Sequence, residues 1–149
     1  GYILNLMDQI AFACSSKHSR SYCVTASVNK VDFLNPIEVG ELVTLKAAIN
    51  YTGRTSMVVG VRVESENITT GKKKHCNSSY FTMVAKDING KSMPVPGLIV
   101  DDVQGVRRFA RSMQRKSEAS SRSTRFYATN FKVEDYLASL DNENVKIEI

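Results

Sequence analysis

The sequence has few of the residues from which metal centres, disulfide frameworks and histidine-based active sites are built. Its three cysteines are an odd number, and Cys14, Cys23 and Cys76 lack the paired spacing of a zinc site or a set of disulfide bonds. Three reduced thiols in the cytoplasm, or in a similarly reducing compartment, are the simplest interpretation. The two histidines, His18 and His75, have no motif around them, so neither a metal site nor a Ser/His/Asp triad is indicated.

A long hydrophobic run is also missing, because no apolar stretch approaches the length of a membrane span. The 149 residues suffice for one domain with its own core, and contents of 42% hydrophobic and 23% charged residues are ordinary for a soluble globular protein. The first residue is Gly1 rather than methionine. We therefore expect the natural start to lie upstream, where a removed targeting segment cannot be judged.

Positive charge exceeds negative charge, with a net charge of +5, and the densest basic stretch runs from Arg107 to Arg125. A solvated helix and tail is the preferred interpretation of this excess; the alternative is an anionic partner, such as nucleic acid, a membrane surface or a polyphosphate ligand. Interleaved aromatic residues are few before Phe126 and Tyr127, so base stacking has little support. We do not expect nucleic acid as a partner.

The first two thirds of the chain predict one helix followed by antiparallel strands. From Gly1 to Lys17 apolar residues cover nearly every side of a helix, which predicts that this helix is buried. Stretches rich in β-formers and bounded by turn residues follow, and short turns between them favour antiparallel pairing. These stretches are 22–28 with a continuation at 31–34, then 42–51, 56–66 and 76–86, with an exposed lysine turn at 72–74. A sheet wrapped around the helix would explain why the helix has no polar face.

The last third reads differently, because Pro94, Pro96 and Gly97 end the sheet pattern. An amphipathic helix is predicted from Asp101 to Lys116, with acidic residues near its start and arginines further on. A mobile Ser/Arg-rich linker at 117–124, a short helix at 130–140 and a weakly specified acidic end at 141–148 are predicted to follow. We thus expect a domain at 1–100 and a helical, basic extension at 101–149.

Asp8 is the residue that does not suit a buried helix. A buried carboxylate is costly unless it is paired or hydrogen-bonded, and no Lys or Arg lies one helical turn away. One interpretation is an aspartate that faces solvent or bonds to backbone groups. The functional interpretation is a general base or nucleophile at a lined cleft, with Asn5 and Gln9 as neighbours that could orient it.

Several segments resemble, in order, those of the hot-dog acyl-CoA thioesterases. The segment Thr52–Met57 (TGRTSM) is the most specific of them. The others are Gly1–Asp8 (GYILNLMD), Val24–Val28 (VTASV), Phe33–Ile37 (FLNPI), Val39–Glu41 (VGE), and Phe81–Ala85 (FTMVA) with Pro94–Pro96 (PVP). The resemblance runs from Gly1 to about Leu98, and it implies an α+β hot-dog fold in which a curved antiparallel sheet surrounds a long central helix.

The resemblance also implies an activity and an assembly. The family's catalytic aspartate falls on Asp8, and the implied reaction is hydrolysis of a fatty acyl-CoA to a fatty acid and coenzyme A. Such proteins form homodimers with a continuous sheet, often assembled into hexamers as trimers of dimers, and their active sites lie at the dimer interface. Coenzyme A enters as part of the substrate, and no metal or other cofactor is expected.

The chemistry of a thioester suggests roles for further residues. Backbone N–H groups near Gly1 and Tyr2, at the start of the helix, suit the charge that develops on the thioester oxygen. Arg54, with Thr55, Ser56 and Met57, is the first candidate for contacts with pantetheine and phosphates. Lys72–Lys74, or Arg107 and Arg108, are second candidates for the nucleotide, although ordinary surface charge is the preferred interpretation of these residues.

One departure from the family leaves an alternative open. The family usually has an asparagine on a strand and loop a few residues before the glycine that opens the helix, and this chain begins at that glycine. We therefore expect a first strand upstream of Gly1. If that segment is absent, the alternative is an acyl-CoA-binding or interaction module that keeps the fold without turnover.

Overall fold

The computed structural model describes residues 1–123 and 128–149, with side chains described for 1–120 and 129–149. The chain forms two compact units, Gly1–Met113 and Gln114–Ile149. Arg125, which ends the predicted basic stretch, and the two aromatic residues after it, Phe126 and Tyr127, lie outside the described residues. The predicted division near residue 100 stays a prediction.

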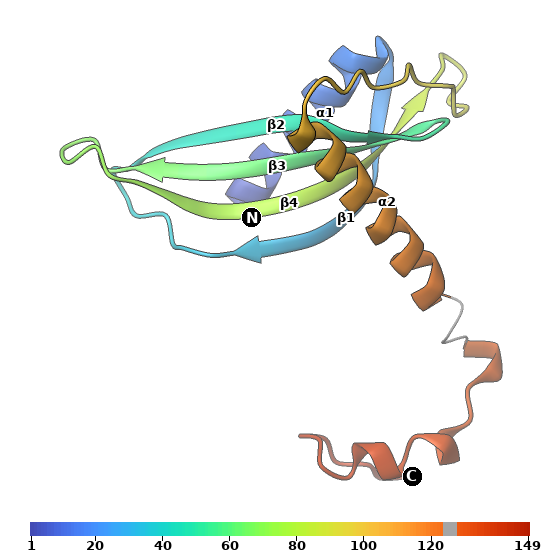
Figure 1. Ribbon diagram of the computed structural model, residues 1–149. Helices are drawn as coiled ribbons and strands as arrows, with labels where there is room; N and C mark the ends of the chain where they lie inside the picture. The colour runs from blue at the N-terminus through green and yellow to red at the C-terminus, as the bar shows by residue number, and fades with distance from the viewer. Residues whose placement is uncertain (124–127) are drawn as a thin grey trace. The chain divides into compact units, whose positions relative to one another are not determined.

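The first unit is built on a four-stranded antiparallel sheet with the strand order β1-β4-β3-β2 (Figure 1). Its strands are β1 (Tyr22–Phe33), β2 (Leu42–Thr52), β3 (Ser56–Glu66) and β4 (Lys73–Lys86). The predicted stretches 22–28 and 31–34 form one strand, because the chain passes an irregularity between Asn29 and Val31 at which Lys30 has a φ of 49°. β4 begins earlier than predicted, since Lys73 and Lys74 pair with Glu66 and Ser65 of β3 rather than forming an exposed turn.

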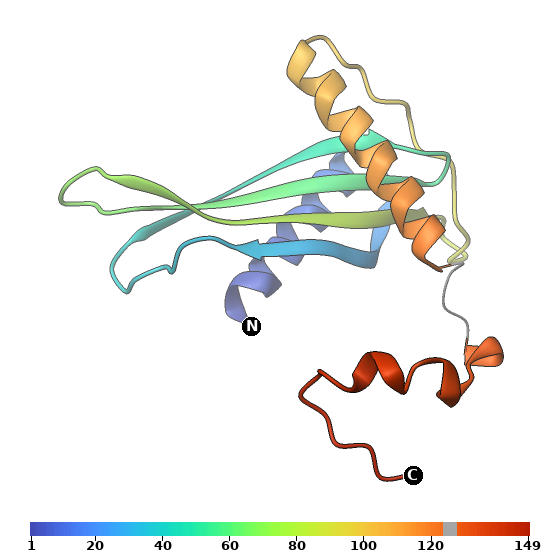
Figure 2. The same cartoon turned by 60° about the horizontal axis from the view of Figure 1, so that its bottom comes forward.

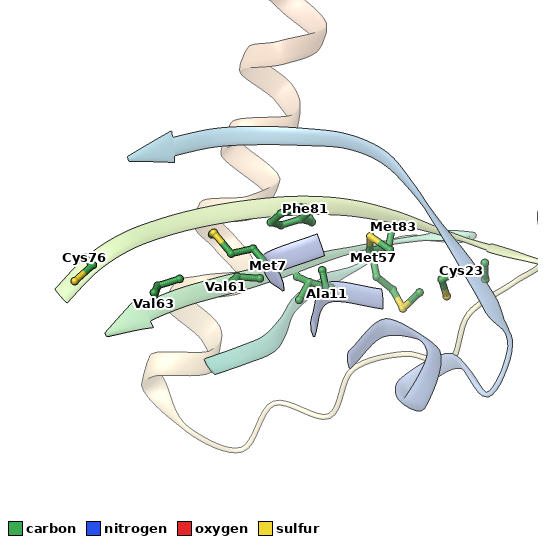
Figure 3. Close-up of a cluster of buried hydrophobic side chains, with 11 residues drawn as sticks. Met7, Ala11, Cys23, Met57, Val61, Val63, Cys76, Phe81 and Met83 are labelled. Atoms are coloured by element: carbon green, nitrogen blue, oxygen red, sulfur yellow. The ribbon is translucent and has the colours of Figure 1, made fainter. Parts of the chain in front are cut away.

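Helix α1 (Tyr2–Ser19) lies on one face of this sheet (Figures 1 and 2). Its buried residues are Met7, Ala11, Ser15 and Ser19, which recur every fourth position and therefore form a single stripe. Met7 and Ala11 point at inward-facing side chains of β3 and β4 (Figure 3). Those side chains are Met57, Val59, Val61, Val63, Phe81 and Met83.

The prediction that α1 is buried on all sides is wrong for this chain. Tyr2, Leu4 and Phe12 are 76%, 38% and 39% exposed. The physical reason is that the sheet covers one side of the helix, and the described residues provide no layer against the other side.

The segment after β4 is fastened to the rest of the first unit. The backbone N–H of Met93 donates to the carbonyl of Ala85 at 3.0 Å, and that of Val95 donates to the carbonyl of Arg54 at 2.9 Å. The Nε2 atom of His18 lies 2.9 Å from the carbonyl of Pro96. The proline-rich segment thus ends the sheet, as predicted, and packs along the β2–β3 hairpin.

Helix α2 (Val103–Ser123) is longer than the predicted helix 101–116. Its first half lies on the sheet face opposite α1, with the ring centroid of Phe109 4.8 Å from that of Tyr51 (Figure 1). The predicted linker is wrong over residues 117–123, which continue the helix; they contain no proline or glycine to end it. Thr124 lies outside the described residues.

The second unit contains the end of α2 and three single 3₁₀ turns, η1 (Ala128–Asn130), η2 (Val133–Asp135) and η3 (Ala138–Leu140). These turns replace the continuous helix predicted at 130–140, because Lys132 has an extended backbone that interrupts it. The rings of Phe131 and Tyr136 stack at 5.3 Å. Among the described residues, no helix is both long enough and apolar enough to cross a membrane.

Candidate active site

Asp8 and Thr25 form the closest polar contact between α1 and β1. The Thr25 hydroxyl donates a hydrogen bond of 2.6 Å to Oδ1 of Asp8, and the same hydroxyl lies 3.4 Å from the Met83 sulfur. A hydroxyl has one proton, and a carboxylate is a far better acceptor than a thioether. The contact therefore anchors one carboxylate oxygen of Asp8, and none of the described residues forms a hydrogen bond with Oδ2.

Asp8 is half-buried, which corrects the prediction of a carboxylate inside a fully buried helix. It follows Met7 along α1, so its side chain leaves the buried stripe and reaches the edge strand β1. Its partner is a neutral hydroxyl, and the sequence analysis missed Thr25. The two residues are 17 positions apart, and the only signal in the sequence was that the segment Val24–Val28 contains hydroxyl side chains, those of Thr25 and Ser27.

The first turn of α1 holds the predicted residues Gly1, Tyr2 and Asn5. The first helical hydrogen bond joins the N–H of Asn5 to the carbonyl of Gly1 at 3.1 Å, and no side chain caps the helix. The preceding N–H groups have no acceptor within the helix and form the positive end of its dipole. A Cβ atom on Gly1 would meet no atom of the chain within 4 Å, so packing within this chain does not require glycine there.

The predicted coenzyme A residues Arg54, Thr55, Ser56 and Met57 lie at the β2–β3 hairpin. Arg54 is exposed and Thr55 and Ser56 are half-buried. The N–H of Gly53 donates to the carbonyl of Ser56 at 2.8 Å and closes the turn. Met57 is 0% exposed and packs in the core, so in this chain it shapes the site from behind rather than presenting a surface to a ligand.

The strand register relates this hairpin to Asp8. Met83 of β4 pairs with Thr25 of β1 on one side and with Met57 of β3 on the other. Thr25 and the hairpin are therefore at the same end of the sheet, about 10 Å apart across two strand spacings. Gly1 lies in the other direction, about 10 Å from Asp8 along the helix axis.

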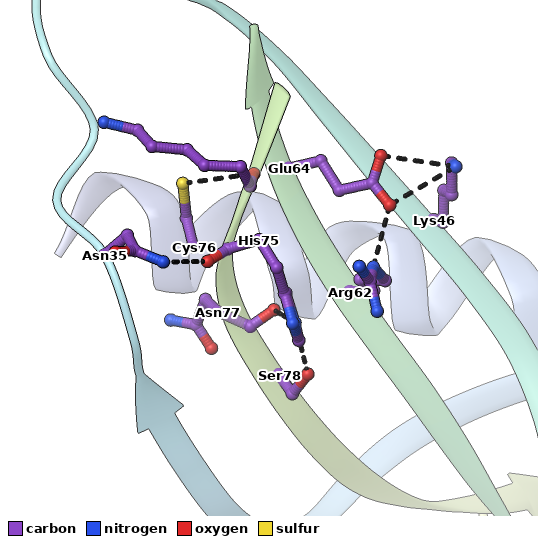
Figure 4. Close-up of polar contacts among 9 residues, drawn as sticks. Asn35, Lys46, Arg62, Glu64, His75, Cys76, Asn77 and Ser78 are labelled. Atoms are coloured by element: carbon purple, nitrogen blue, oxygen red, sulfur yellow. Dashed lines mark hydrogen bonds and ion pairs between the residues drawn. The ribbon is translucent and has the colours of Figure 1, made fainter. Parts of the chain in front are cut away.

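The basic side chains predicted as second candidates are partly engaged in ion pairs. Lys74 lies 3.1 Å from Oε1 of Glu41, whereas Lys72 is exposed in the β3–β4 turn. Arg107 and Arg108 are exposed on the first half of α2. On the sheet, Glu64 lies between Arg62 and Lys46, at 2.7 Å and 3.3 Å, and the hydrogen bond from Arg62 is the first cause of its lowered pKa (Figure 4).

The described residues show no cluster of three or more His, Cys, Asp or Glu side chains that could hold a metal ion. Cys14, Cys23 and Cys76 are free thiols. Burial raises the pKa of the Cys14 thiol above its ordinary value. None of these groups contributes to the Asp8–Thr25 contact.

Comparison with known proteins gives the same family by three routes. The sequence model of the thioesterase superfamily matches residues 1–72. Protein VdlD of Helicobacter pylori is 45% identical over 78% of this chain and 66% of its own length, so the chain spans just under two thirds of that relative. The uncharacterized acyl-CoA thioester hydrolase YkhA of Bacillus subtilis is 34% identical over 82% of this chain and 71% of its own length.

Solved structures extend the likeness to the fold. A hexameric acyl-CoA thioesterase in its apo form superposes with a TM-score of 0.81 at 37% identity, over 85% of this chain and 81% of that one. An acyl-CoA hydrolase of Staphylococcus aureus, solved with butyryl coenzyme A and coenzyme A, gives a TM-score of 0.76 at 32% identity, over 83% and 76%. That hydrolase has also been solved with alanine replacing an aspartate, a threonine 17 residues after it, or an asparagine before it. By sequence and by architecture, this chain has the hot-dog fold and belongs to the thioesterase superfamily.

Proposed function

We propose that this chain hydrolyses fatty acyl-CoA thioesters to the free acid and coenzyme A, with Asp8 as its general base or nucleophile. The observation that carries the proposal is the contact from Thr25 to Asp8, which holds a half-buried carboxylate on the central helix with one oxygen free. Its 17-residue spacing equals that between the aspartate and threonine substituted in the S. aureus hydrolase. Similarity to acyl-CoA thioester hydrolases supports the reaction class.

Two routes use this geometry. In the first, Oδ2 of Asp8 takes a proton from a water molecule that attacks the thioester carbonyl carbon. In the second, Oδ2 attacks that carbon itself, coenzyme A leaves as the thiolate, and water hydrolyses the resulting anhydride. Label in the Asp8 carboxylate after a single turnover in ¹⁸O-labelled water identifies the second route, with attack of water on the aspartyl carbonyl carbon of the anhydride.

The oxyanion formed in either route needs donors aimed at it. We assign this role to the backbone N–H groups near Gly1 and Tyr2, which have no acceptor within α1. The first turn and Asp8 of one protomer are about 10 Å apart along the helix, which exceeds the span of one thioester group. We therefore place the active site at the interface of a homodimer, where the first turn of one protomer meets Asp8 of its partner.

The coenzyme A portion carries phosphates, for which an exposed guanidinium is a suitable partner. We assign this contact to Arg54, with the hydroxyls of Thr55 and Ser56 beside it at the hairpin. We also propose that the dimers assemble into a hexamer, as in the apo neighbour. A cytoplasmic location is proposed because it is consistent with three free thiols.

The first prediction tests Asp8 and Thr25 by thiol release from a panel of acyl-CoAs. Asp8→Asn and Asp8→Ala should each lower kcat by about 10²–10⁴-fold, because they remove the proton acceptor or nucleophile. Thr25→Val should lower kcat by about 10-fold, because one anchoring hydrogen bond is lost. Asp32→Asn is the matched control. Asp32 lies on β1, the strand that also carries Thr25, and it forms a surface ion pair with Lys30.

Unchanged turnover in both Asp8 variants would show that the active site lies elsewhere on the fold. If the wild-type protein binds acyl-CoA but releases no free thiol, it is a binding module of the same fold rather than a hydrolase. Circular dichroism of each variant checks that a loss of turnover is not a loss of folding.

A further inference from the structure

A pocket of about 400 Å³ opens at the N-terminal end of α1. Its walls are Ile3 of α1, Phe33 at the end of β1 with the segment 34–37 after it, and Cys76 and Asn77 of β4. Its volume is within the range of small-molecule sites. Ile3 precedes Asp8 by little more than one helical turn, about 7.5 Å along the axis, so the pocket is within reach of the proposed reaction centre.

Asn77 is the unusual residue of this pocket. The residue is 1% exposed, and its Nδ2 has no hydrogen-bond partner among the described residues. The Ser79 hydroxyl donates to its Oδ1 at 3.4 Å, so the amide oxygen is paired within the chain. In Figure 4 the Asn77 amide extends away from the side chains of His75 and Ser78. Buried N–H groups are almost always paired, so Nδ2 calls for an acceptor that the described residues do not supply.

The part of the wall that follows Phe33, the strand partner of Asn77, is fixed to β4 by hydrogen bonds. The N–H of Leu34 donates to the carbonyl of Cys76 at 2.9 Å, and the Asn35 amide donates to the carbonyl of His75 at 2.7 Å (Figure 4). Phe33, Leu34, Pro36 and Ile37 contribute apolar surface. The pocket therefore combines a fixed apolar lining with one buried donor, which is the usual construction of a site that selects an apolar ligand by a single polar group.

Resting on the proposed thioesterase function, we propose that this pocket receives the acyl group and that Asn77 Nδ2 donates a hydrogen bond to an oxygen on the acyl chain. Hydroxy- and oxo-acyl thioesters share this acceptor, and unsubstituted chains lack it. A site that pairs a buried donor with a substrate oxygen discriminates against an analogue without that oxygen, because the donor is then left unpaired. The enzyme should accordingly favour oxygenated over plain acyl chains of the same length.

The second prediction is tested by kcat/KM for hexanoyl-CoA and its 3-hydroxy, 3-oxo, 5-hydroxy and 5-oxo derivatives. Wild-type enzyme should favour at least one oxygenated chain over hexanoyl-CoA by about 10-fold or more. Asn77→Leu should bring that ratio close to one, because leucine has a similar size and no donor. Asn89→Leu, in an exposed turn, is the matched control and should keep the wild-type ratio.

Ser79→Ala provides a second variant if Asn77→Leu fails to fold. It removes the hydroxyl that fixes the Asn77 amide and should reduce the ratio by a smaller factor. A wild-type enzyme that hydrolyses all five thioesters with no preference, or a preference that survives both variants, would overturn the role of Asn77. Failure to hydrolyse any acyl-CoA would instead count against the proposed function itself.

Discussion

Glu41 shows at the scale of one residue how the loop beside the pocket is fastened. Its Oε1 accepts a hydrogen bond of 2.7 Å from the N–H of Glu38 and lies 3.1 Å from Nζ of Lys74. Its Oε2 accepts a bond of 3.4 Å from the Ser65 hydroxyl. The N–H of Glu38 first, and then Lys74 and Ser65, hold the pKa of Glu41 below its ordinary value. The ionised carboxylate thus joins the β1–β2 loop to β3 and β4.

The third prediction follows from this lowered pKa. A carboxylate whose pKa is lower in the folded state stabilises the fold above its unfolded pKa, and this contribution is lost as the pH falls through the folded pKa. Glu41→Gln should therefore lower the Tm at neutral pH, and its difference from wild type should shrink below the ordinary glutamate pKa of about 4.3. Thermal unfolding across this pH range, with Glu38→Gln as control, measures the effect. A difference that is constant with pH would contradict it.

At the scale of elements, the contact between α1 and the sheet is the main source of the core. Met7 and Ala11 are 0% exposed, and they face Met57, Val61 and Phe81 across the interface (Figure 3). The inner face of the sheet becomes more polar towards the pocket, where Ser65, Cys76 and Asn77 replace the methionines and valines. The apolar end of the sheet's inner face therefore stabilises the fold, and the more polar end of that face adjoins the proposed acyl pocket.

The fourth prediction concerns Met7. Met7→Ala removes a fully buried side chain and leaves a cavity, so it should lower the free energy of unfolding by about 2–5 kcal/mol. Ile68→Ala, at a side chain that is 71% exposed, should change it by about 0.5 kcal/mol or less. Urea denaturation of both variants gives the comparison. Equal effects would mean that α1 does not provide the core of the first unit.

The whole first unit exposes more apolar surface than its own sheet can cover. β1 and β2 are the two edges of the described sheet, and edge strands carry unpaired backbone groups that suit pairing with another chain. Val28 and Phe33 on β1 are 47% and 70% exposed, and Leu4 and Phe12 of α1 are exposed on the side away from the sheet. A second copy of the chain along β1 would cover such surface, and the proposed active site also needs one.

The fifth prediction tests this assembly with matched charges. Val28→Lys on β1 should reduce the molar mass measured by light scattering and should lower thiol release, because the dimer that completes the site is weakened. Ile88→Lys, at a turn residue that is 99% exposed, should change neither. A native mass and full turnover for Val28→Lys would place the interface away from this edge.

Much of the first unit was predictable from local pattern. The alternation of residues 56–66 predicted β3 with its observed bounds, and the segments from Gly1 to about Leu98 indicated the family. Asp8 was singled out because a carboxylate interrupts an otherwise apolar helix. These signals lie within short stretches of chain, where the period of side chains and the chemistry of turns act directly.

Other features depended on contacts between distant segments. Thr25 contacts Asp8 from 17 residues away in the sequence. Asn77 lines the pocket because β4 pairs with its neighbouring strands. Helix α1 has an exposed side because the sheet covers only one of its faces. The sequence by itself determined the order of helix and strands, the family and the candidate carboxylate. Only the tertiary structure decided which hydroxyl holds that carboxylate and which buried amide has no partner, because strand register and packing, rather than local pattern, select the neighbours of a side chain.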